Sequence, residues 1–308
     1  MSNLEALLLG IVQGISEFLP ISSSGHLVLV RYHLNWGDSL PLYVGIATNT
    51  GTLLAVLVAL RRVVWDTLIG MLASVRLIWQ QQVWPRFAAK RVAVAYVEAE
   101  AAELNGISDV GSVSDVGDER EQQRLQAFRL ALLVIVGSLP TAVIGLTLEP
   151  FFERLGTPVP TSLALVLTGF VLWFVPKTGH KNDPRAITWA DALLVGVMQG
   201  LAVMPGISRA GITISFLLWR GVSSDLAARL SFLLYLVVSF GVGLLGIGEL
   251  ANANITLLPL ALMTLTSFVA GYLALIGLLR ILQRGQLHRF APYLWTVALL
   301  TLVRVALS

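Results

Sequence analysis

The chain has 308 residues, of which 56% are hydrophobic and only 13% are charged, and its formal net charge is +3. Soluble domains carry about 25% charged residues, so this composition, with a mean hydropathy of +0.78, excludes an ordinary soluble domain. It indicates an integral membrane protein with helical spans. The chain has no Cys, which excludes disulfide bonds and thiol chemistry.

Uninterrupted apolar runs of membrane-spanning length occur six times along the chain. A transmembrane helix needs about 20 residues, with a range of about 17–25. We therefore expect six transmembrane helices. The runs are Pro41–Leu60, Ala127–Leu148, Val159–Val175, Leu226–Ile247, Ile255–Leu279 and Ala291–Ala306.

Two further apolar segments, Leu4–Val30 and Ile187–Leu218, are interrupted near their middles by Pro, Ser and Gly. The interruptions read LPISSSG at Leu19–Gly25 and MPGISRAG at Met204–Gly211. Irregular backbone is tolerated at membrane depth only where it is buried in protein or lines a wet cavity. The pattern favours two re-entrant helix–loop–helix hairpins, and two kinked full spans are the alternative.

The two interrupted segments are copies of each other. Glu5–His26 aligns without a gap with Asp191–Ile212, which lies 186 positions later, and nine of the 22 pairs are identical. The residues Ala6, Leu7, Leu8, Gly10, Gln13, Gly14, Ile21, Ser22 and Gly25 recur as Ala192, Leu193, Leu194, Gly196, Gln199, Gly200, Ile207, Ser208 and Gly211. A duplicated frame with different charged residues suggests one composite site where the two copies meet.

The alternation of crossings places the two hairpins on opposite sides of the membrane, which is an inverted repeat. Basic residues gather on one side, so by the positive-inside rule that side is cytoplasmic. Both termini and the site would then face outward from the inner (plasma) membrane. The basic residues assigned to the cytoplasmic side are Arg61, Arg62, Arg76, Arg86, Lys90, Arg91, Arg120, Arg124, Lys177, Lys181, Arg185, Arg220, Arg280, Arg284 and Arg289.

The fold class expected is an all-α polytopic membrane protein: an inverted-topology repeat with six transmembrane helices and two re-entrant hairpins. One membrane domain would comprise a first repeat (1–60), a cytoplasmic loop (61–126), two spans with a loop (127–186), and a second repeat of a hairpin plus three spans (187–308). Within the loop, Val63–Trp84 mixes apolar residues, Arg and three Trp, which is typical of an amphipathic helix on the inner leaflet. The acidic, Gly- and Ser-rich remainder favours a solvated linker over a regulatory element.

Glu17 is the charged residue of the first hairpin. It follows Gln13 by four residues and therefore shares its helix face. An ionisable residue in an apolar segment costs several kcal/mol, so it is functional by default. The alternative is a structural ion pair, for which the partner would be Arg209 of the second hairpin, so both interpretations bring the hairpins together.

Ser22, Ser23, Ser24 and Gly25 follow the proline break and precede His26. A helix that starts there would present backbone N–H groups and the positive end of its dipole, which bind anions. The serines could instead act only as helix caps, which use the same geometry. His26 can act as nucleophile, general acid or general base, and a satisfied core histidine is the alternative.

The second hairpin repeats the design with a cation. Arg209 offers a planar, permanently charged fork that suits phosphate oxygens. Together the two copies offer a carboxylate, an imidazole, hydroxyls, backbone donors and a guanidinium, which is the inventory of phosphoryl transfer. A site within the membrane suits a phosphorylated lipid. The surrounding residues of the second hairpin are Pro205, Gly206, Ser208, Gly211 and Thr213.

Three motifs resemble one known family. QGISEFLPISSSGH at Gln13–His26 resembles the [E/Q]xxxE…PxSSxGH signature of the undecaprenyl-diphosphate phosphatase family (BacA-type, bacitracin resistance). PGISRAGIT at Pro205–Thr213 resembles the family's PGxSRSxxT signature, and GSLPTAVIG at Gly137–Gly145 is similar to its G-x-[IL]-P-x-x-[VI]-x-G helix. The resemblance covers nearly the whole chain except about 85–126.

This resemblance implies a membrane phosphatase that converts a polyprenyl diphosphate of the C55 type to the monophosphate and recycles the lipid carrier of cell-wall glycans. It implies inverted repeats, an outward-facing site, a divalent cation (Mg²⁺ or Ca²⁺) at Glu17 and Gln13, and a tendency to form homodimers among membrane lipids, with no nucleic-acid partner. The residues it assigns to catalysis are Glu17, His26, Ser22, Ser23 and Arg209, and those it assigns to substrate binding are Ser24, Gly25, Gly206, Ser208, Gly211 and Thr213.

Three departures from the family pattern bear on the metal and the lipid. Gln13 stands where the family often has Glu, which removes one metal-binding charge. Ala210 replaces the usual Ser, and the stretch Ala47–Thr52 stands where members usually show Gln or His before Leu-Gly. The competing function is a polyprenyl-phosphate flippase or transporter, because inverted repeats are typical of alternating access. A structural scaffold would leave Glu17, His26 and Arg209 without a role.

Overall fold

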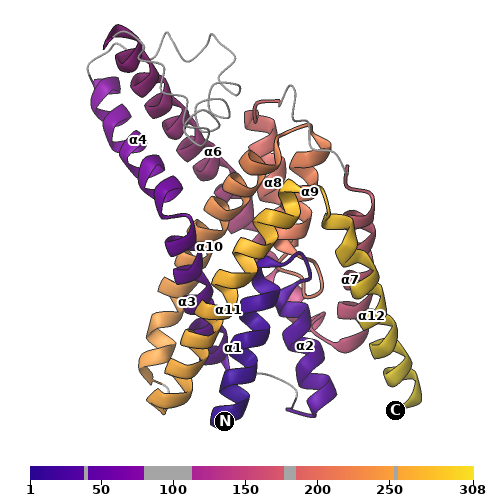
Figure 1. Cartoon of the computed structure of the whole chain (residues 1–308). Helices are drawn as coiled ribbons and strands as arrows, with labels where there is room; N and C mark the ends of the chain where they lie inside the picture. Colours follow the sequence, from indigo (N-terminus) through magenta and orange to yellow (C-terminus); the bar gives the residue numbers. More distant parts are fainter. Residues whose placement is uncertain (38–40, 80–112, 177–184, 253–255) are drawn as a thin grey trace.

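The computed structural model describes residues 1–37, 41–79, 113–176, 185–252 and 256–308, and in these ranges the protein is entirely helical, with no strand (Figure 1). The first half of the chain forms α1 (Asn3–Phe18), α2 (Ser23–Leu34), α3 (Leu42–Ala59), α4 (Arg61–Trp79), α6 (Val113–Arg154) and α7 (Pro158–Trp173). The second half forms α8 (Trp189–Leu201), α9 (Arg209–Trp219), α10 (Ser224–Asn252), α11 (Leu257–Gln283), the 3₁₀ turn η2 (Leu287–Arg289) and α12 (Phe290–Leu307).

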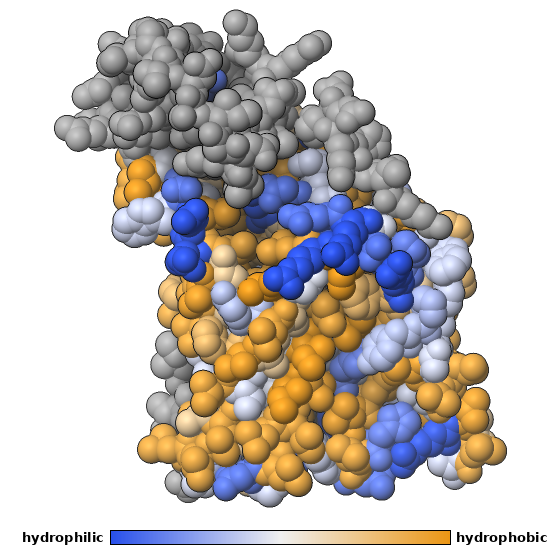
Figure 2. Space-filling view, viewed as in Figure 1, coloured by the Kyte–Doolittle hydropathy of each residue, from blue (hydrophilic) through white to orange (hydrophobic). Residues whose placement is uncertain are grey.

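Four of these helices are long and apolar enough to cross a membrane by themselves. Their spanning parts are Leu125–Arg154, Ser224–Leu244, Leu257–Gln283 and Leu287–Leu307. A fifth candidate is the pair Tyr43–Ala59 and Arg61–Leu72, which is bent by 78°. The protein is therefore an all-helical, multi-pass membrane protein, and its apolar side chains cover most of the face in Figure 2 below a polar band.

Each of the six predicted spans corresponds to a helix, although the bounds differ. The span predicted at Val159–Val175 is the 16-residue α7, which falls short of spanning length. The span predicted from Ala127 lies within α6, and this helix already begins at Val113, because the Glu, Arg and Gln residues before the span are good helix formers. This helical start replaces part of the predicted linker, and the rest of that linker, up to 112, lies outside the described residues.

The helix predicted from Val63 is α4, which packs along α6 (Figure 1). Its last predicted residues, 80–84, lie outside the described ranges. Whether α4 lies on the inner leaflet stays a prediction.

The repeated segments form matching pairs of short helices, α1 with α2 and α8 with α9. Both pairs begin with a capping box, which Ser2 and Glu5 form on α1, and Thr188 and Asp191 form on α8. α1 ends at Phe18 directly before Leu19 and Pro20, because proline lacks the N–H that a continuing helix needs. The two breaks predicted from sequence are thus confirmed as helix ends.

Glycines that recur in both copies allow close helix packing. Gly10 and Gly14 lie against α11, where a methyl group on Gly14 would approach the Ser267 carbonyl oxygen to 2.6 Å. Gly196 and Gly200 lie against α6, where the same change would press on Gly137 and Ile144. Small residues four apart let membrane helices approach closely. The GxxxG spacing of the repeat therefore fixes where each hairpin sits on its partner helix.

A substitution at one of these glycines tests the packing. In Gly196→Ala, the added methyl group meets the Gly137 carbonyl oxygen and the Pro140 ring, so α8 must move away from α6. We expect a loss of about 1–3 kcal/mol, the usual cost of overpacking, measured as a lower melting temperature in detergent. Gly45→Ala is the control, because a methyl group there meets nothing within 4 Å. Equal melting temperatures for the two variants would contradict this account.

Candidate active site

The loops of the two hairpins touch inside the helical bundle. The Ser22 hydroxyl oxygen accepts a hydrogen bond from the Gly206 N–H at 3.1 Å, across 184 residues of chain. A methyl group on Gly25 would lie 2.9 Å from the Gly206 Cα atom. Gly206 itself has φ +97°, which favours glycine. The predicted meeting of the two copies is therefore observed, and glycine is required on both sides of it.

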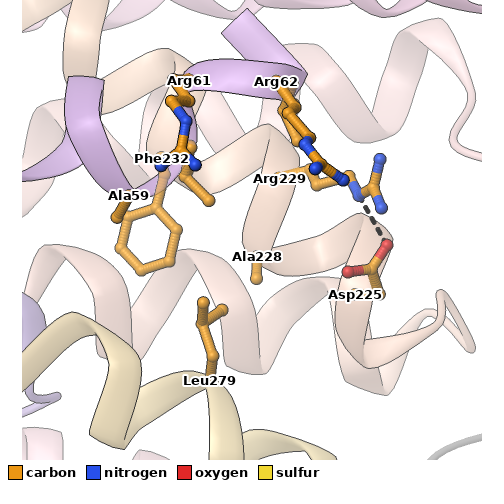
Figure 3. A pocket seen from close by; sticks show the side chains of 10 residues that line it. Ala59, Arg61, Arg62, Asp225, Ala228, Arg229, Phe232 and Leu279 are labelled. Carbon is orange, nitrogen blue, oxygen red and sulfur yellow. Dashed lines mark ion pairs between the residues drawn. The ribbon is translucent and has the colours of Figure 1, made fainter.

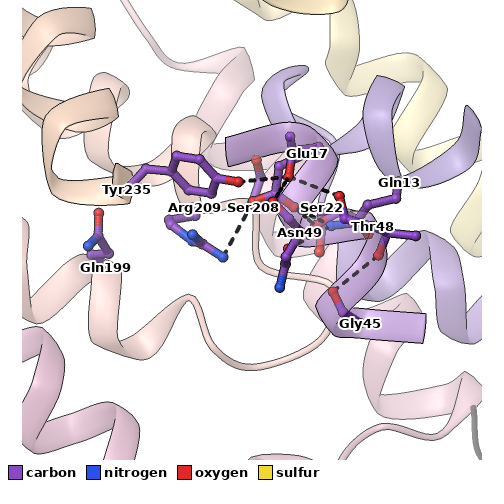
Figure 4. A network of polar contacts seen from close by, with 12 residues as sticks. Gln13, Glu17, Ser22, Gly45, Thr48, Asn49, Gln199, Ser208, Arg209 and Tyr235 are labelled. Carbon is purple, nitrogen blue, oxygen red and sulfur yellow. Dashed lines mark hydrogen bonds and ion pairs between the residues drawn. The ribbon is translucent and has the colours of Figure 1, made fainter. Parts of the chain in front are cut away.

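Glu17 lies at this junction with a nearly buried carboxylate, whose side chain is 4% exposed. One of its oxygens accepts hydrogen bonds from the Gln13 amide at 2.8 Å and from the Ser23 hydroxyl at 2.5 Å. The other lies 3.5 Å from an Arg209 guanidinium nitrogen. The Gln13 amide also donates to Asn49 on α3 at 3.2 Å. Figure 4 shows Gln13 and Glu17 of α1 converging with Asn49 of α3 and Arg209 of α9.

Arg209 is held on two sides but keeps part of its guanidinium available. Its guanidinium carbon lies 5.0 Å from the centre of the Tyr235 ring, in cation–π contact. Its side chain is 29% exposed, and its Nη1 atom is buried without a hydrogen-bond partner. A small pocket lies beside it, and Glu17, Ser231 and Phe232 also line that pocket. The cation is thus oriented, and one of its nitrogens is left without a hydrogen-bond partner.

The serines of the two copies cap the second helix of each hairpin. Ser22 accepts from the Gly25 N–H at 3.3 Å, and Ser208 accepts from the Gly211 N–H at 3.1 Å. Ser22 and Ser208 are therefore N-caps, and the helix start predicted at Ser22–Ser24 is confirmed at Ser23. Ser22 also has φ 71°, a strained conformation for a residue with a side chain. Anion binding by these helix ends stays a prediction.

His26 is buried beside the junction and has partners at both ring nitrogens. Nδ1 lies 2.8 Å from the Ser22 carbonyl oxygen, and Nε2 lies 2.8 Å from the Tyr293 hydroxyl. The two rings stack, with centroids 5.7 Å apart and an interplanar angle of 9°. The imidazole is therefore oriented by α12, an element that no sequence motif linked to the site.

The remaining predicted residues surround this centre. Thr213 is fully buried, and its hydroxyl contacts Ser231 at 2.6 Å and the Arg209 carbonyl oxygen at 2.8 Å, so it lies behind Arg209. Gly211 packs on Ser208 and Pro20. Ser24 is half-buried next to the centre. These positions fit a supporting role in the local backbone, with Ser24 the most accessible of them.

Three residues of the site were missed by the motif analysis: Asn49, Tyr235 and Tyr293. Asn49 lies within the stretch that departs from the family pattern, and a lone amide in an apolar span was the signal that could have found it. Tyr235 contacts Thr52 at 2.8 Å and supports Arg209. Tyrosines in apolar helices are common, so neither Tyr235 nor Tyr293 carried a sequence signal of its own.

The donor set near Glu17 suits a hard divalent cation that is shared with a phosphorylated ligand. No group of three His, Asp or Glu side chains lies together in the described part of the chain. Glu17 supplies one carboxylate, and the buried Gln13 carbonyl oxygen has no hydrogen-bond partner. Mg²⁺ is commonly bound through one or two carboxylates, water and substrate phosphates. The residues present therefore fit such an ion, with most of its ligands from outside the protein.

The fold and the site define a class: a helical membrane protein whose buried acid–base centre is assembled from two duplicated hairpins. Residues 6–300 match the family described as "Bacitracin resistance protein BacA", and the chain belongs to this family. It is 49% identical to an "Undecaprenyl-diphosphatase" of Acaryochloris marina over the full length of both chains. Proteins of the same name from Desulfosudis oleivorans (36%, 98% of each chain) and Carboxydothermus hydrogenoformans (33%, 98% and 97%) are also similar.

The contact between Tyr293 and His26 predicts a change in the reactivity of the imidazole. Tyr293→Phe keeps the stacked ring and removes the hydroxyl from Nε2. Losing a hydrogen bond worth about 1 kcal/mol should raise the rate of His26 acylation by diethyl pyrocarbonate about fivefold. Peptide mass spectrometry measures this rate, with His288 as the internal reference and Tyr272→Phe as the control. An unchanged rate at His26 would show that the hydroxyl does not hold the ring.

Proposed function

We propose that the protein is a membrane phosphatase that hydrolyses undecaprenyl diphosphate to undecaprenyl monophosphate and inorganic phosphate. The reaction would recycle the lipid carrier for cell-wall glycan synthesis. The observation that carries the proposal is the contact of Glu17 with both Ser23 and Arg209 inside an apolar helical bundle. The family and the name of the similar proteins support the same reaction.

The diphosphate would bind where two helix N-termini converge. α2 begins at Ser23 and α9 begins at Arg209, so unpaired N–H groups and the positive dipole ends meet beside the guanidinium. The free Nη1 atom of Arg209 would bind a phosphate oxygen, and Ser24 would add a hydroxyl. Together these donors neutralise the charge that develops on the transferred phosphoryl group.

Ser23 is the nucleophile that this geometry favours. Its hydroxyl already donates to Glu17, so the carboxylate can take the proton as the oxygen attacks the terminal phosphorus. The bridging P–O bond breaks, undecaprenyl monophosphate leaves, and a phosphoserine remains. Water then attacks that phosphorus, the Ser23–phosphorus bond breaks, and inorganic phosphate is released. His26 is the alternative nucleophile, but both of its ring nitrogens have partners.

A divalent cation, Mg²⁺ or Ca²⁺, would be held by Glu17 and the Gln13 carbonyl oxygen. When bound it would neutralise diphosphate charge and help to place the terminal phosphorus. Because Gln13 is uncharged, the protein would contribute a single negative charge, and binding of the ion would depend on the substrate. Gln13 and Ser23 would meanwhile keep the Glu17 carboxylate oriented.

The membrane arrangement that supports this chemistry is an inverted repeat with two re-entrant hairpins. α1, α2, α8 and α9 have 16, 12, 13 and 11 residues. At 1.5 Å per residue none reaches the roughly 30 Å of a bilayer core. Each pair of short helices packs on a helix from the other half of the chain: α1 packs on α11, and α8 packs on α6. The six spans of this arrangement would be α3, α6, α7, α10, α11 and α12, of which α7 has only 16 residues, as α1 does. Both termini and the site would then lie outside the plasma membrane.

A polyprenyl-phosphate flippase is the competing proposal, because inverted repeats also serve alternating access. A flippase moves lipid without breaking a phosphoanhydride bond. Release of phosphate by detergent-solubilised protein separates the two, since transport requires a sealed membrane. The homodimer expected from the family resemblance stays a prediction.

Substitutions at the Glu17–Arg209 contact test the proposed function. Glu17→Gln removes the base, and Arg209→Ala removes the phosphate clamp. We expect each to lower phosphate release from undecaprenyl diphosphate at least 100-fold, the usual range for losing a catalytic base or a charged clamp. Glu5→Gln is the control on the same helix, because Glu5 is half-buried at the start of α1 and forms its capping box with Ser2. Turnover like the wild type in a folded Glu17 or Arg209 variant would refute the assignment.

Metal removal gives a separate test. We expect a chelator to abolish phosphate release and added Mg²⁺ or Ca²⁺ to restore it. Gln13→Glu adds a carboxylate next to Glu17, so it should lower the metal concentration needed for half-maximal rate. Activity that persists in the chelator would exclude the metal, although it would leave the serine mechanism intact.

A further inference from the structure

A second charged pocket lies at the bend between α3 and α4, outside the site described above. Arg61 and Arg62 form the first turn of α4, and they face Arg229 and Asp225 on the first turns of α10. Figure 3 shows the guanidinium groups of Arg61, Arg62 and Arg229 around this pocket. Its position is toward the end of the molecule that is remote from both termini (Figure 1).

The pocket brings three guanidinium groups together. Arg229 is largely buried and pairs with Asp225 at 2.6 Å. Arg61 and Arg62 are exposed, and Arg61 donates to the Val58 carbonyl oxygen at 3.3 Å. Two exposed guanidinium groups, those of Arg61 and Arg62, therefore line the same pocket as the Arg229–Asp225 pair. Arg61 and Arg62 also lie at the positive end of the α4 dipole, where cations are unfavourable. An anion in the pocket would relieve both effects.

The floor of the pocket is apolar. Phe232, Leu279 and Ala228 line it below the arginines. Phe232 also lines the small pocket of Glu17 and Arg209, and its ring packs edge-on against Phe18 with centroids 6.0 Å apart. An aromatic side chain thus separates the two pockets. A polar rim over an apolar floor suits a phosphate group that carries hydrocarbon, as in the head group of a phospholipid.

We infer that Arg61, Arg62 and Arg229 form a second phosphate-binding site, which takes the head group of an anionic membrane lipid. The bend of 78° between α3 and α4 creates this site, because it turns the first residues of α4 toward α10. Arg forks bind phosphate oxygens through paired hydrogen bonds. The lipid phosphate would then bridge α4 and α10, whose arginines line the same pocket.

The test uses the full chain in nanodiscs and measures binding of spin-labelled or brominated phosphatidylglycerol against phosphatidylcholine. We expect saturable binding of phosphatidylglycerol, and a loss of at least tenfold in affinity for Arg61→Gln/Arg62→Gln. Arg229 is left in place because it pairs with Asp225. Arg280→Gln/Arg284→Gln is the control: it removes the same charge from the exposed end of α11 and leaves the lining of the pocket intact. Melting temperatures in lipid-free detergent check that both variants fold.

Equal losses in the two double variants would show diffuse attraction to surface charge and would overturn the inference, as would the absence of saturable binding by the wild type. A second arm titrates inorganic phosphate alone in detergent. One outcome is that low millimolar phosphate raises the melting temperature of the wild type but not that of the Arg61/Arg62 variant, while phosphatidylglycerol does not bind. The pocket would then hold free phosphate rather than a lipid. Neither arm depends on catalysis, so failure of the proposed phosphatase activity would be recognised separately.

Discussion

The contact between the two hairpin tips is the constraint on which the site depends. A buried carboxylate costs several kcal/mol unless it is paired and hydrogen-bonded, and Glu17 obtains its cation from a segment 192 positions away. The backbone approach at Gly25 and Gly206, with the Ser22 hydroxyl between the loops, brings the charges within reach. The packing of each hairpin on its own partner helix then determines how well that pair is held.

This dependence explains why so much of the conserved frame between the two copies is small or polar. Gly14 and Gly200 permit close packing on α11 and α6, and Ser22 and Ser208 replace the hydrogen bonds missing at a helix start. In a membrane there is no water to satisfy backbone groups at a helix break, so a break needs such partners within the protein. The residues shared by the two copies therefore stabilise the helix breaks, and the N-termini of α2 and α9 are directed at a common point as a result.

The sequence predicted the helices, the two breaks and the meeting of the two hairpins, and it named Arg209 as the partner of Glu17 if that carboxylate were paired. These features could be predicted because hydropathy, proline and the cost of intramembrane charge act locally or through charge neutrality. The sequence did not predict the roles of Tyr293 and Tyr235, because helix packing brings these side chains to the site. Tyr293 is 267 residues from His26 along the chain, and Tyr235 is 26 residues from Arg209. Helix bounds also escaped it: α6 begins at Val113 within a stretch whose composition favoured a linker. Local helix propensity and packing against α4 outweigh composition there.

The alignment of the two copies shows which residues around Glu17 are equivalent. Ser23 and Arg209 occupy equivalent positions, each the first residue of the second helix of its hairpin, and both contact Glu17. The position equivalent to Glu17 is Val203, so only one copy supplies a carboxylate. One acid thus meets a hydroxyl from its own copy and a cation from the other. If both copies carried Val, Arg209 would lack this counter-ion. Divergence at these two pairs of positions, Glu17 with Val203 and Ser23 with Arg209, therefore makes the contact between the copies asymmetric.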